Sequence, residues 1–168
     1  LEALLNFQTV ICDLTGMEIA NSSLLDESTS AAEAMSMLFA SRSRKQKKAG
    51  SNKFFVSNQV MPQTISVLET RAIPIGIELV IGDVFENQFD DSYFAVLLQY
   101  PEKNGGVVNY KNLSDALAEM DIKIAVAADI MSLALLTPPG EWGADVVVGT
   151  TQRFGIPLGY GGPHAAFF

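Results

Sequence analysis

The residues best placed to do chemistry lie near the end of the chain, in the stretch Gly149–Phe168. Four glycines and two prolines fall between Gly155 and Pro163. Glycine reaches positive φ without strain and proline fixes φ, so this density predicts a loop of fixed shape. The loop connects two apolar runs, Ala144–Val148 and His164–Phe168, that we expect to be strands. A shaped loop between strands is where an α/β enzyme would present a side chain that links a cofactor.

His164 is the only histidine of the chain. A metal site would need further ligands, and no cluster of His, Cys, Asp or Glu lies at ligand spacing near it. We therefore expect no metal site and interpret His164 as a residue that anchors the loop or lies at an interface. Trp142 is expected to anchor its segment against the core or a partner subunit.

A second stretch of interest precedes a helix that we expect from about Asp26 to Ser41. Its N-terminus fits a capping box of Ser30 and Glu33, with Asp26 as an alternative cap. The free N–H groups and positive dipole of a helix N-terminus attract anions such as phosphate. Here Asp26 and the adjacent Glu27 would repel a phosphate, although Ser28, Thr29 and Ser30 could still donate hydrogen bonds to one.

The remaining chain alternates between strands and helices. Near-continuous apolar strands in such an alternation predict an α/β fold, a mostly parallel sheet covered by helices on both faces, over a single domain of residues 1–168. Functional loops then gather at the carboxyl ends of the strands. An amphipathic helix is expected first, over Leu1–Thr15. The expected strands are Lys53–Ser57, Ile77–Ile81, Tyr93–Tyr100, Lys123–Ala128 and Ala144–Val148, and the further helices are Pro62–Thr70, Leu113–Asp121 and Ile130–Leu136, the last closed by Pro138–Gly140.

Composition excludes several classes of function. The apolar fraction of 48% allows a large core, and 18% charged residues make disorder unexpected. A net charge of −8 argues against a nucleic-acid or anionic-membrane partner, and no apolar run is long enough to span a bilayer. The only strongly basic run, Arg42–Lys48, is interpreted as a solvated loop after a helix. The single cysteine, Cys12, permits no internal disulfide and fits a soluble protein of a reducing compartment.

Two long stretches resemble one enzyme family. Leu133–Phe168, with LLTPPGEWGADVVVGTTQRFGIPLGYGGPHAAFF, and Leu1–Ala40, with LLNFQTVICDLTGMEIANSSLLDESTSAAEAM, are similar to the N-terminal half of the pyridoxal-phosphate-dependent glycine decarboxylases, the P proteins of the glycine cleavage system. The resemblance implies the large domain of an aminotransferase-like fold (fold type I). It also implies that this chain is a fragment, because the proteins of the family are several times longer.

The resemblance implies that the catalytic lysine lies elsewhere. The C-terminal half of the family carries a His-Lys-Thr-Phe pattern whose Lys forms the Schiff base, and Gln152 occupies that position here. An amide cannot form an imine, and the guanidinium of the adjacent Arg153 is no substitute. We therefore expect no catalytic residue in this chain and the cofactor bound by the other half.

Four residues remain weak candidates for contacts with the cofactor: Ser28, Thr29, Asp129 and His164. Asp129 ends a strand, where aminotransferase-like enzymes place an Asp on the pyridine nitrogen. Its register differs from the Asp-Gly-Ala of the active half, so the N-cap of the following helix is favoured for it. The loop Gln99–Gly106 should lie at the level of the cofactor site in the relatives.

The resemblance also implies an activity for the parent protein. It would decarboxylate glycine with pyridoxal phosphate and pass the aminomethyl group to the lipoyl arm of H protein. Its partners would be the active C-terminal half and H protein, in a homo- or hetero-oligomer, in the cytoplasm of a bacterium or the mitochondrion of a eukaryote. The alternative for this fragment is an inert module that docks the active half. A nucleotide site at Gly159–Gly162 is disfavoured, because a strand rather than a helix follows the glycines.

Overall fold

A six-stranded sheet organises the molecule, whose computed structural model describes residues 1–21 and 23–168. Its strand order is β2-β1-β3-β4-β5-β6. The four pairings among the first five strands are parallel, and β6 alone runs antiparallel to its neighbour β5. The strands are β1 (Lys53–Ser57), β2 (Glu78–Gly82), β3 (Tyr93–Tyr100), β4 (Lys123–Ala128), β5 (Val146–Thr150) and β6 (Ala166–Phe167).

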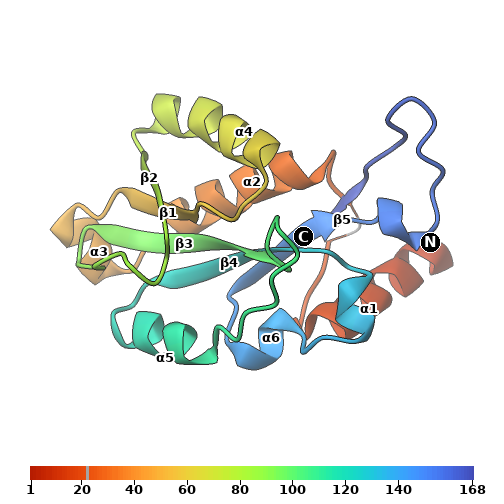
Figure 1. The fold of residues 1–168 in the computed structure, drawn as a ribbon. Helices are drawn as coiled ribbons and strands as arrows, with labels where there is room; N and C mark the ends of the chain where they lie inside the picture. The colour runs from red at the N-terminus through yellow and green to blue at the C-terminus, as the bar shows by residue number, and fades with distance from the viewer. Residues whose placement is uncertain (22) are drawn as a thin grey trace.

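Helices cover both faces of the sheet, as Figure 1 shows, so the predicted architecture is confirmed. The helices α2 (Glu27–Ala40) and α4 (Pro62–Ala72) lie on one face. The opposite face carries α1 (Glu2–Thr15), α5 (Lys111–Glu119) and α6 (Pro139–Trp142). The short α3 (Arg44–Ala49) lies beside the sheet. Within the described residues, no helix is long and apolar enough to cross a bilayer.

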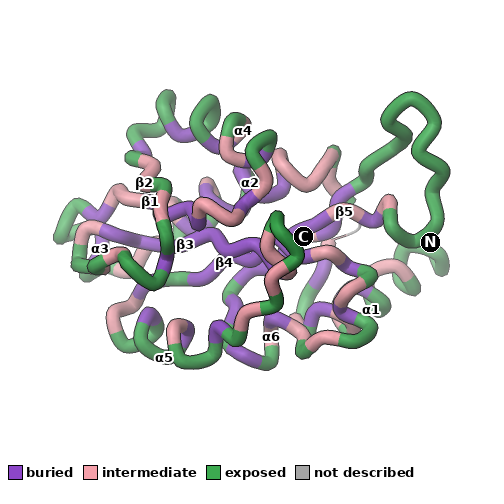
Figure 2. The backbone as a smooth tube through the Cα atoms, in the orientation of Figure 1, coloured by how far each residue is buried: buried purple, intermediate pink, exposed green. Residues whose placement is uncertain are grey.

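Strand β3 shows why the sheet is covered on both faces. All eight of its residues are buried, as the tube in Figure 2 makes visible. Phe94 and Leu97 belong to the core under α2 and α4, while Val96 and Leu98 belong to the core on the opposite side. A strand buried on both sides carries an almost unbroken apolar sequence, which is the pattern that predicted a parallel sheet.

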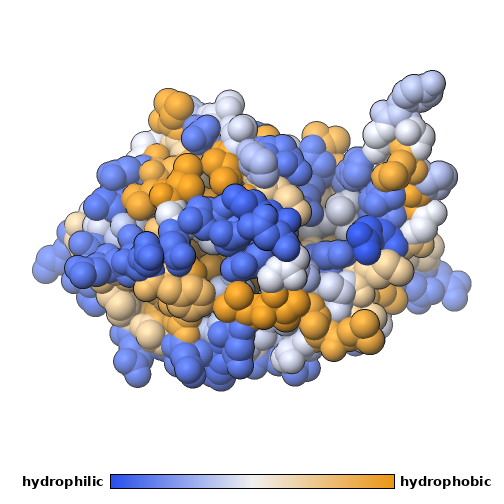
Figure 3. All heavy atoms as spheres, in the orientation of Figure 1, coloured by the Kyte–Doolittle hydropathy of each residue, from blue (hydrophilic) through white to orange (hydrophobic). Residues whose placement is uncertain are grey.

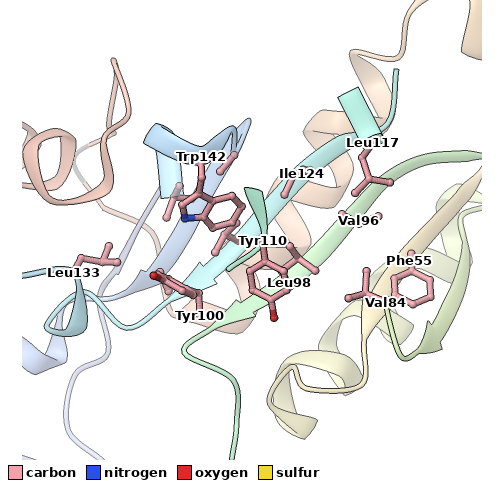
Figure 4. Packing of buried hydrophobic residues seen from close by; sticks show 14 of the residues in the cluster. Phe55, Val84, Val96, Leu98, Tyr100, Tyr110, Leu117, Ile124, Leu133 and Trp142 are labelled. Carbon is pink, nitrogen blue, oxygen red and sulfur yellow. The ribbon is translucent and has the colours of Figure 1, made fainter. Parts of the chain in front are cut away.

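Aromatic side chains consolidate the core on the side of α5 and α6. Trp142 packs against Tyr100 and Tyr110, with ring centroids 5.9 and 5.7 Å apart, and Figure 4 shows the three rings together. Trp142 is only 6% exposed, so the expectation that it anchors its segment against the core is confirmed. The segment before it differs from the prediction, because Pro139 begins α6 where Pro138–Gly140 was expected only to close a helix.

The basic run Arg42–Lys48 is not a loop, and that prediction was wrong. Helix α3 begins after Ser43, whose side chain accepts a hydrogen bond from Gln46 N while Gln46 Oε1 accepts one from Ser43 N. The buried Gln46 also donates through Nε2 to Asp121 O at 2.6 Å. A reciprocal Ser-x-x-Gln capping box and one buried amide therefore form a helix that charge alone did not indicate.

Two other segments are less regular than predicted. Only a 3-10 turn, Ser132–Ala134, forms within Ile130–Leu136. The strand expected over His164–Phe168 is limited to Ala166–Phe167, which pairs with just two residues of β5. On its other side, Ala166 forms an antiparallel bridge with Leu24. Ala165 O still accepts hydrogen bonds from Thr151 N and Oγ1, and the ladder with β5 extends no further toward the glycine-rich loop.

The N-terminus of α2 is capped by Asp26. The prediction of a capping box formed by Ser30 and Glu33 was wrong. Thr29 N donates to Asp26 Oδ1 at 2.7 Å, and the Thr29 hydroxyl accepts from Asp26 N at 3.2 Å. Asp26 was the alternative cap, and the box that forms uses Thr29 as its third helical residue.

Removing this cap is expected to destabilise the fold moderately. Asp26→Ala leaves the Thr29 N–H without its partner, which should lower the free energy of unfolding by about 1 kcal/mol. Urea denaturation followed by circular dichroism measures the loss. Asp26→Asn keeps an oxygen in the same place and should retain most of the stability, so equal losses in both variants would contradict a capping role.

Candidate functional site

A polar cavity of about 460 Å³ opens where the carboxyl ends of β3, β4 and β5 meet the N-terminus of α2. Parallel strands bring their carboxyl ends to one edge of a sheet, which is where α/β proteins place their ligands. The cavity is lined by Asp26, Glu27, Ser28, Met61, Gln63, Thr64, Gln99, Asp129, Thr150, Arg153 and His164. Three of the four candidate residues, Ser28, Asp129 and His164, are thus brought together.

Asp129 follows β4 and lies in the wall of this cavity. Its Oδ1 accepts a hydrogen bond from Met131 N at 3.1 Å, and this bond forms a turn. The prediction that Asp129 is the N-cap of a following helix was therefore wrong. Its Oδ2 lies 3.6 Å from a guanidinium nitrogen of Arg153. The Arg153 side chain is 52% exposed, so this is a weak, solvated ion pair.

Among the acidic groups that line the cavity, the carboxyl of Glu27 has the most strongly shifted pKa. Burial first, and then the charges of Asp129 and Asp26, together raise the pKa of its carboxyl to about 7, while His164 acts in the opposite direction. The carboxylates of α2 and of the β4 end therefore share one poorly solvated space. The sequence indicated that Glu27 would repel an anion, but not that its own ionisation would be suppressed.

Gln99, on β3, contributes a polar group without a partner. The residue is 4% exposed, and its Oε1 makes no hydrogen bond with any of the residues that the structure describes. Beside it in the lining, the Ser28 and Thr64 hydroxyls lie 3.1 Å apart and hydrogen-bond to each other. A buried amide oxygen without a donor costs free energy, so Gln99 is a residue that needs an explanation. The signal in the sequence was a lone Gln near the end of an otherwise apolar strand.

Two predicted positions lie outside the cavity lining. Thr29 is used in the capping box of α2. Gln152, which the resemblance led us to expect in the position of the family's lysine, begins a 3-10 turn, and its Nε2 donates to Ile156 O at 2.6 Å. The Gln152 amide therefore ties the start of the glycine-rich loop to the 3-10 turn that precedes it.

The glycine-rich loop projects from the body of the molecule (Figure 1). Apolar side chains lie along it, including Leu158 at 62% exposure and the fully exposed Tyr160. Figure 3 shows the loop standing clear of the surface with apolar side chains on part of its length. His164 returns the chain to the cavity, and its ring is hydrogen-bonded to Gly161 O.

The side chains of the cavity do not fit pyridoxal phosphate. A Schiff base needs an amine, and none of the lining residues is a lysine. A phosphate at the N-terminus of α2 would meet Asp26, which already accepts from Thr29 N, and Glu27. Asp129 is occupied by Met131 N and Arg153 rather than free to face a pyridine nitrogen. Among residues 1–21 and 23–168, no group of three His, Cys, Asp or Glu side chains could hold a metal ion either.

A larger hollow, of about 660 Å³, lies between the end of α1 and β5. Its lining is mainly apolar, with Ile11, Met37 and Phe168 among its walls, and Glu18 and Asp145 are the titratable side chains among the described residues that line it. It lies away from the loop ends at the carboxyl edge of the sheet. We therefore regard the smaller, polar cavity as the candidate site.

The fold is that of the large domain of aminotransferase-like, fold type I proteins. A cystathionine γ-lyase (CalE6) from Micromonospora echinospora superposes with a TM-score of 0.74 over 98% of this chain and 42% of its own, at 16% identity. A crystal structure of glycine decarboxylase (P-protein) of the glycine cleavage system, in inhibitor-bound form, superposes with a TM-score of 0.86 at 31% identity, over 99% of this chain and 38% of its own.

The chain belongs to the family described as the glycine cleavage system P-protein, whose model matches residues 1–168. It is 64% identical to the glycine dehydrogenase (decarboxylating) of Christiangramia forsetii and 61% identical to that of Flavobacterium johnsoniae, in both cases over all 168 residues. The protein of that name from Synechocystis sp. is 55% identical. The chain spans only 17–18% of the length of these relatives.

Proposed function

We propose that this chain is part of a glycine dehydrogenase (decarboxylating), and that it forms part of the large domain in the N-terminal half of that enzyme. The observation that carries the proposal is the match of all 168 residues to the P-protein family, together with 64% identity to a relative of that name. The parent protein would release carbon dioxide from glycine and transfer the aminomethyl group to the lipoyl arm of H protein. The relatives named above are bacterial, which supports a cytoplasmic enzyme.

The proposal assigns the reaction to the other half of the parent protein. Pyridoxal phosphate would be bound there, by a lysine outside these residues. Gln152 and the carboxylates at the N-terminus of α2 support this assignment, because they supply neither an amine nor an anion site. This chain would instead position the active half, and the exposed apolar side chains of the glycine-rich loop, such as Tyr160, offer it a contact surface.

Borohydride trapping of the full-length protein tests the assignment. After loading with pyridoxal phosphate and reduction, peptide mapping should find the cofactor on a lysine outside this chain, and the near-ultraviolet to visible aldimine band should disappear. The 168-residue chain alone should show no such band. A stoichiometric adduct on any of its seven lysines would contradict the proposal. The seven are Lys45, Lys47, Lys48, Lys53, Lys103, Lys111 and Lys123.

A further inference from the structure

We propose that, in the parent protein, the segment that directly follows Phe168 extends strand β6 along β5 and runs through the larger hollow, of about 660 Å³. The inference rests on the proposed function, because it requires the polypeptide to continue into the rest of that enzyme. The chain spans only 17–18% of the length of its relatives, so most of such a parent lies outside these residues. The inference goes further by assigning this apolar surface one occupant, the next segment of the same polypeptide.

The hollow begins where the pairing between β5 and β6 stops. The two residues of β6 pair only with Gly149 and Thr150. Val146 and Val147, at the start of β5, pair with β4 on one side and with no strand of the described residues on the other. Both valines line the hollow, and so does Phe168, which directly follows β6. The unpaired part of β5 is therefore one wall of the hollow.

The backbone of β5 presents hydrogen-bonding groups to this open edge. Backbone groups in a strand face its two edges alternately, and the hydrogen bond of 2.8 Å from Thr151 N to Ala165 O fixes the phase of that alternation. Gly149 and Val147, two and four residues earlier, therefore face the same edge. Gly149 meets β6 there, whereas the N–H and C=O of Val147 have no partner there among the described residues. A continued β6 would set the first residue after Phe168 opposite Val147 and satisfy both groups.

The opposite wall of the hollow lies one strand further on. Phe168 O accepts a hydrogen bond from Asn21 N at 2.9 Å, and Ala166 forms a bridge with Leu24. The chain that leads into α2 thus flanks β6 on the side away from β5. The residues just before it, Gly16–Ala20, line the hollow. The hollow therefore continues the lane that β6 already occupies between these two walls.

The apolar lining and the position of the chain ends favour this occupant. Ile19 is 83% exposed and Met37 is 42% exposed, and covering such side chains stabilises a folded protein. A segment before Leu1 would start far away, because helix α1 carries the chain about 20 Å from Leu1 to Thr15 in the wall of the hollow. Phe168 lies in the wall itself, so the segment that follows it enters the hollow directly.

A disulfide that depends on strand register tests the proposal in the full-length protein. The continued pairing sets the second residue after Phe168 opposite Val146, in a pair without mutual hydrogen bonds whose Cα atoms lie about 4.5 Å apart. Val146→Cys, combined with a cysteine at that second residue, should form a disulfide under mild oxidation, which peptide mapping detects. A cysteine at the fourth residue after Phe168 is the matched control. It should form no disulfide with Val146→Cys, because diagonal neighbours lie about 7–8 Å apart.

A crosslink from the opposite wall decides the matter if Val146→Cys unfolds the protein. Photoreactive benzoylphenylalanine in place of the exposed Ile19 should crosslink to residues just beyond Phe168 of the same polypeptide. The same group in place of Ile73, which is exposed before β2 at the other end of the sheet, should not.

The proposal is overturned if the folded double variant forms no disulfide, or if the group at position 19 crosslinks elsewhere, to a second copy, or not at all. The borohydride mapping of the cofactor does not depend on this register. If it still places pyridoxal phosphate on a lysine outside this chain, the proposed function stands and only the strand extension fails.

Discussion

Glu27→Gln is expected to stabilise the 168-residue chain at neutral and alkaline pH. The ordinary pKa of the carboxyl is 4.5, and in the folded state it is raised to about 7, first by burial and then by Asp129 and Asp26. The folded protein therefore holds a proton that the unfolded chain releases. The stability that Glu27 contributes is complete below pH 4.5 and is lost as the pH rises through 7.

The magnitude follows from the shift. The pKa of the carboxyl differs by about 2.5 between the folded and unfolded states. This difference corresponds to a change of about 3 kcal/mol in the free energy of unfolding at pH 8, which is an upper figure for a half-buried group. Gln has the shape of neutral Glu and does not titrate. The variant and the wild type should therefore be equally stable near pH 4, and the variant should become more stable as the pH rises.

Urea denaturation at a series of pH values between 4 and 8.5 measures this divergence. Glu33→Gln is the matched control, because Glu33 lies on the exposed side of the same helix and its loss should change little at any pH. Parallel stability curves for wild type and Glu27→Gln would show that the carboxyl is solvated in solution.

The sheet was predictable because burial on both faces leaves a strong mark on a sequence. The bounds of β1, β3 and β4 match the predicted strands residue for residue. Each is a run of apolar residues bounded by turn residues, and local sequence is enough to place such a run. The parallel direction of the strands could be predicted from the helices between them, since parallel neighbours need a crossover connection.

The segments that were predicted wrongly are those whose secondary structure depends on tertiary contacts. Helix α3 is held by Gln46, which reaches Asp121 across 75 residues of sequence, and no local pattern carries that information. The segment after Asp129 forms only a 3-10 turn, because the Asp129 side chain and carbonyl both bond back into the turn, to Met131 N and to Ser132. Charge and propensity favoured a loop in the first case and a helix in the second.

The candidate site was predictable in its place but not in its chemistry. Strand ends and a helix N-terminus marked the edge of the sheet, and Ser28, Asp129 and His164 meet there. The unpartnered oxygen of Gln99 and the raised pKa of Glu27 depend on which side chains share a cavity. Those properties arise from burial and proximity, which a sequence without a fold does not contain.

Gly149→Ala is expected to have the largest effect on stability of any small substitution at this edge of the sheet. Gly149 lies in β5 between β4 and β6, and a Cβ there would lie 2.5 Å from the Phe167 ring and closer still to the Ala128 carbonyl oxygen. Both neighbours are buried, and one of them is backbone, so neither can move cheaply. Overpacking of this kind should cost about 3 kcal/mol.

The same clash would reach the site, because Ala128 immediately precedes Asp129 and Thr150 immediately follows Gly149. We therefore expect Gly149→Ala to lower the urea midpoint and to alter the pH dependence that Glu27 imposes. Gly82→Ala is the matched control, since its Cβ would meet only the Phe55 ring at 3.7 Å and its strand lies at the sheet edge, so its stability should change by less than about 1 kcal/mol. Equal effects of the two substitutions would mean that β5 and β6 are not packed as closely as the structure places them.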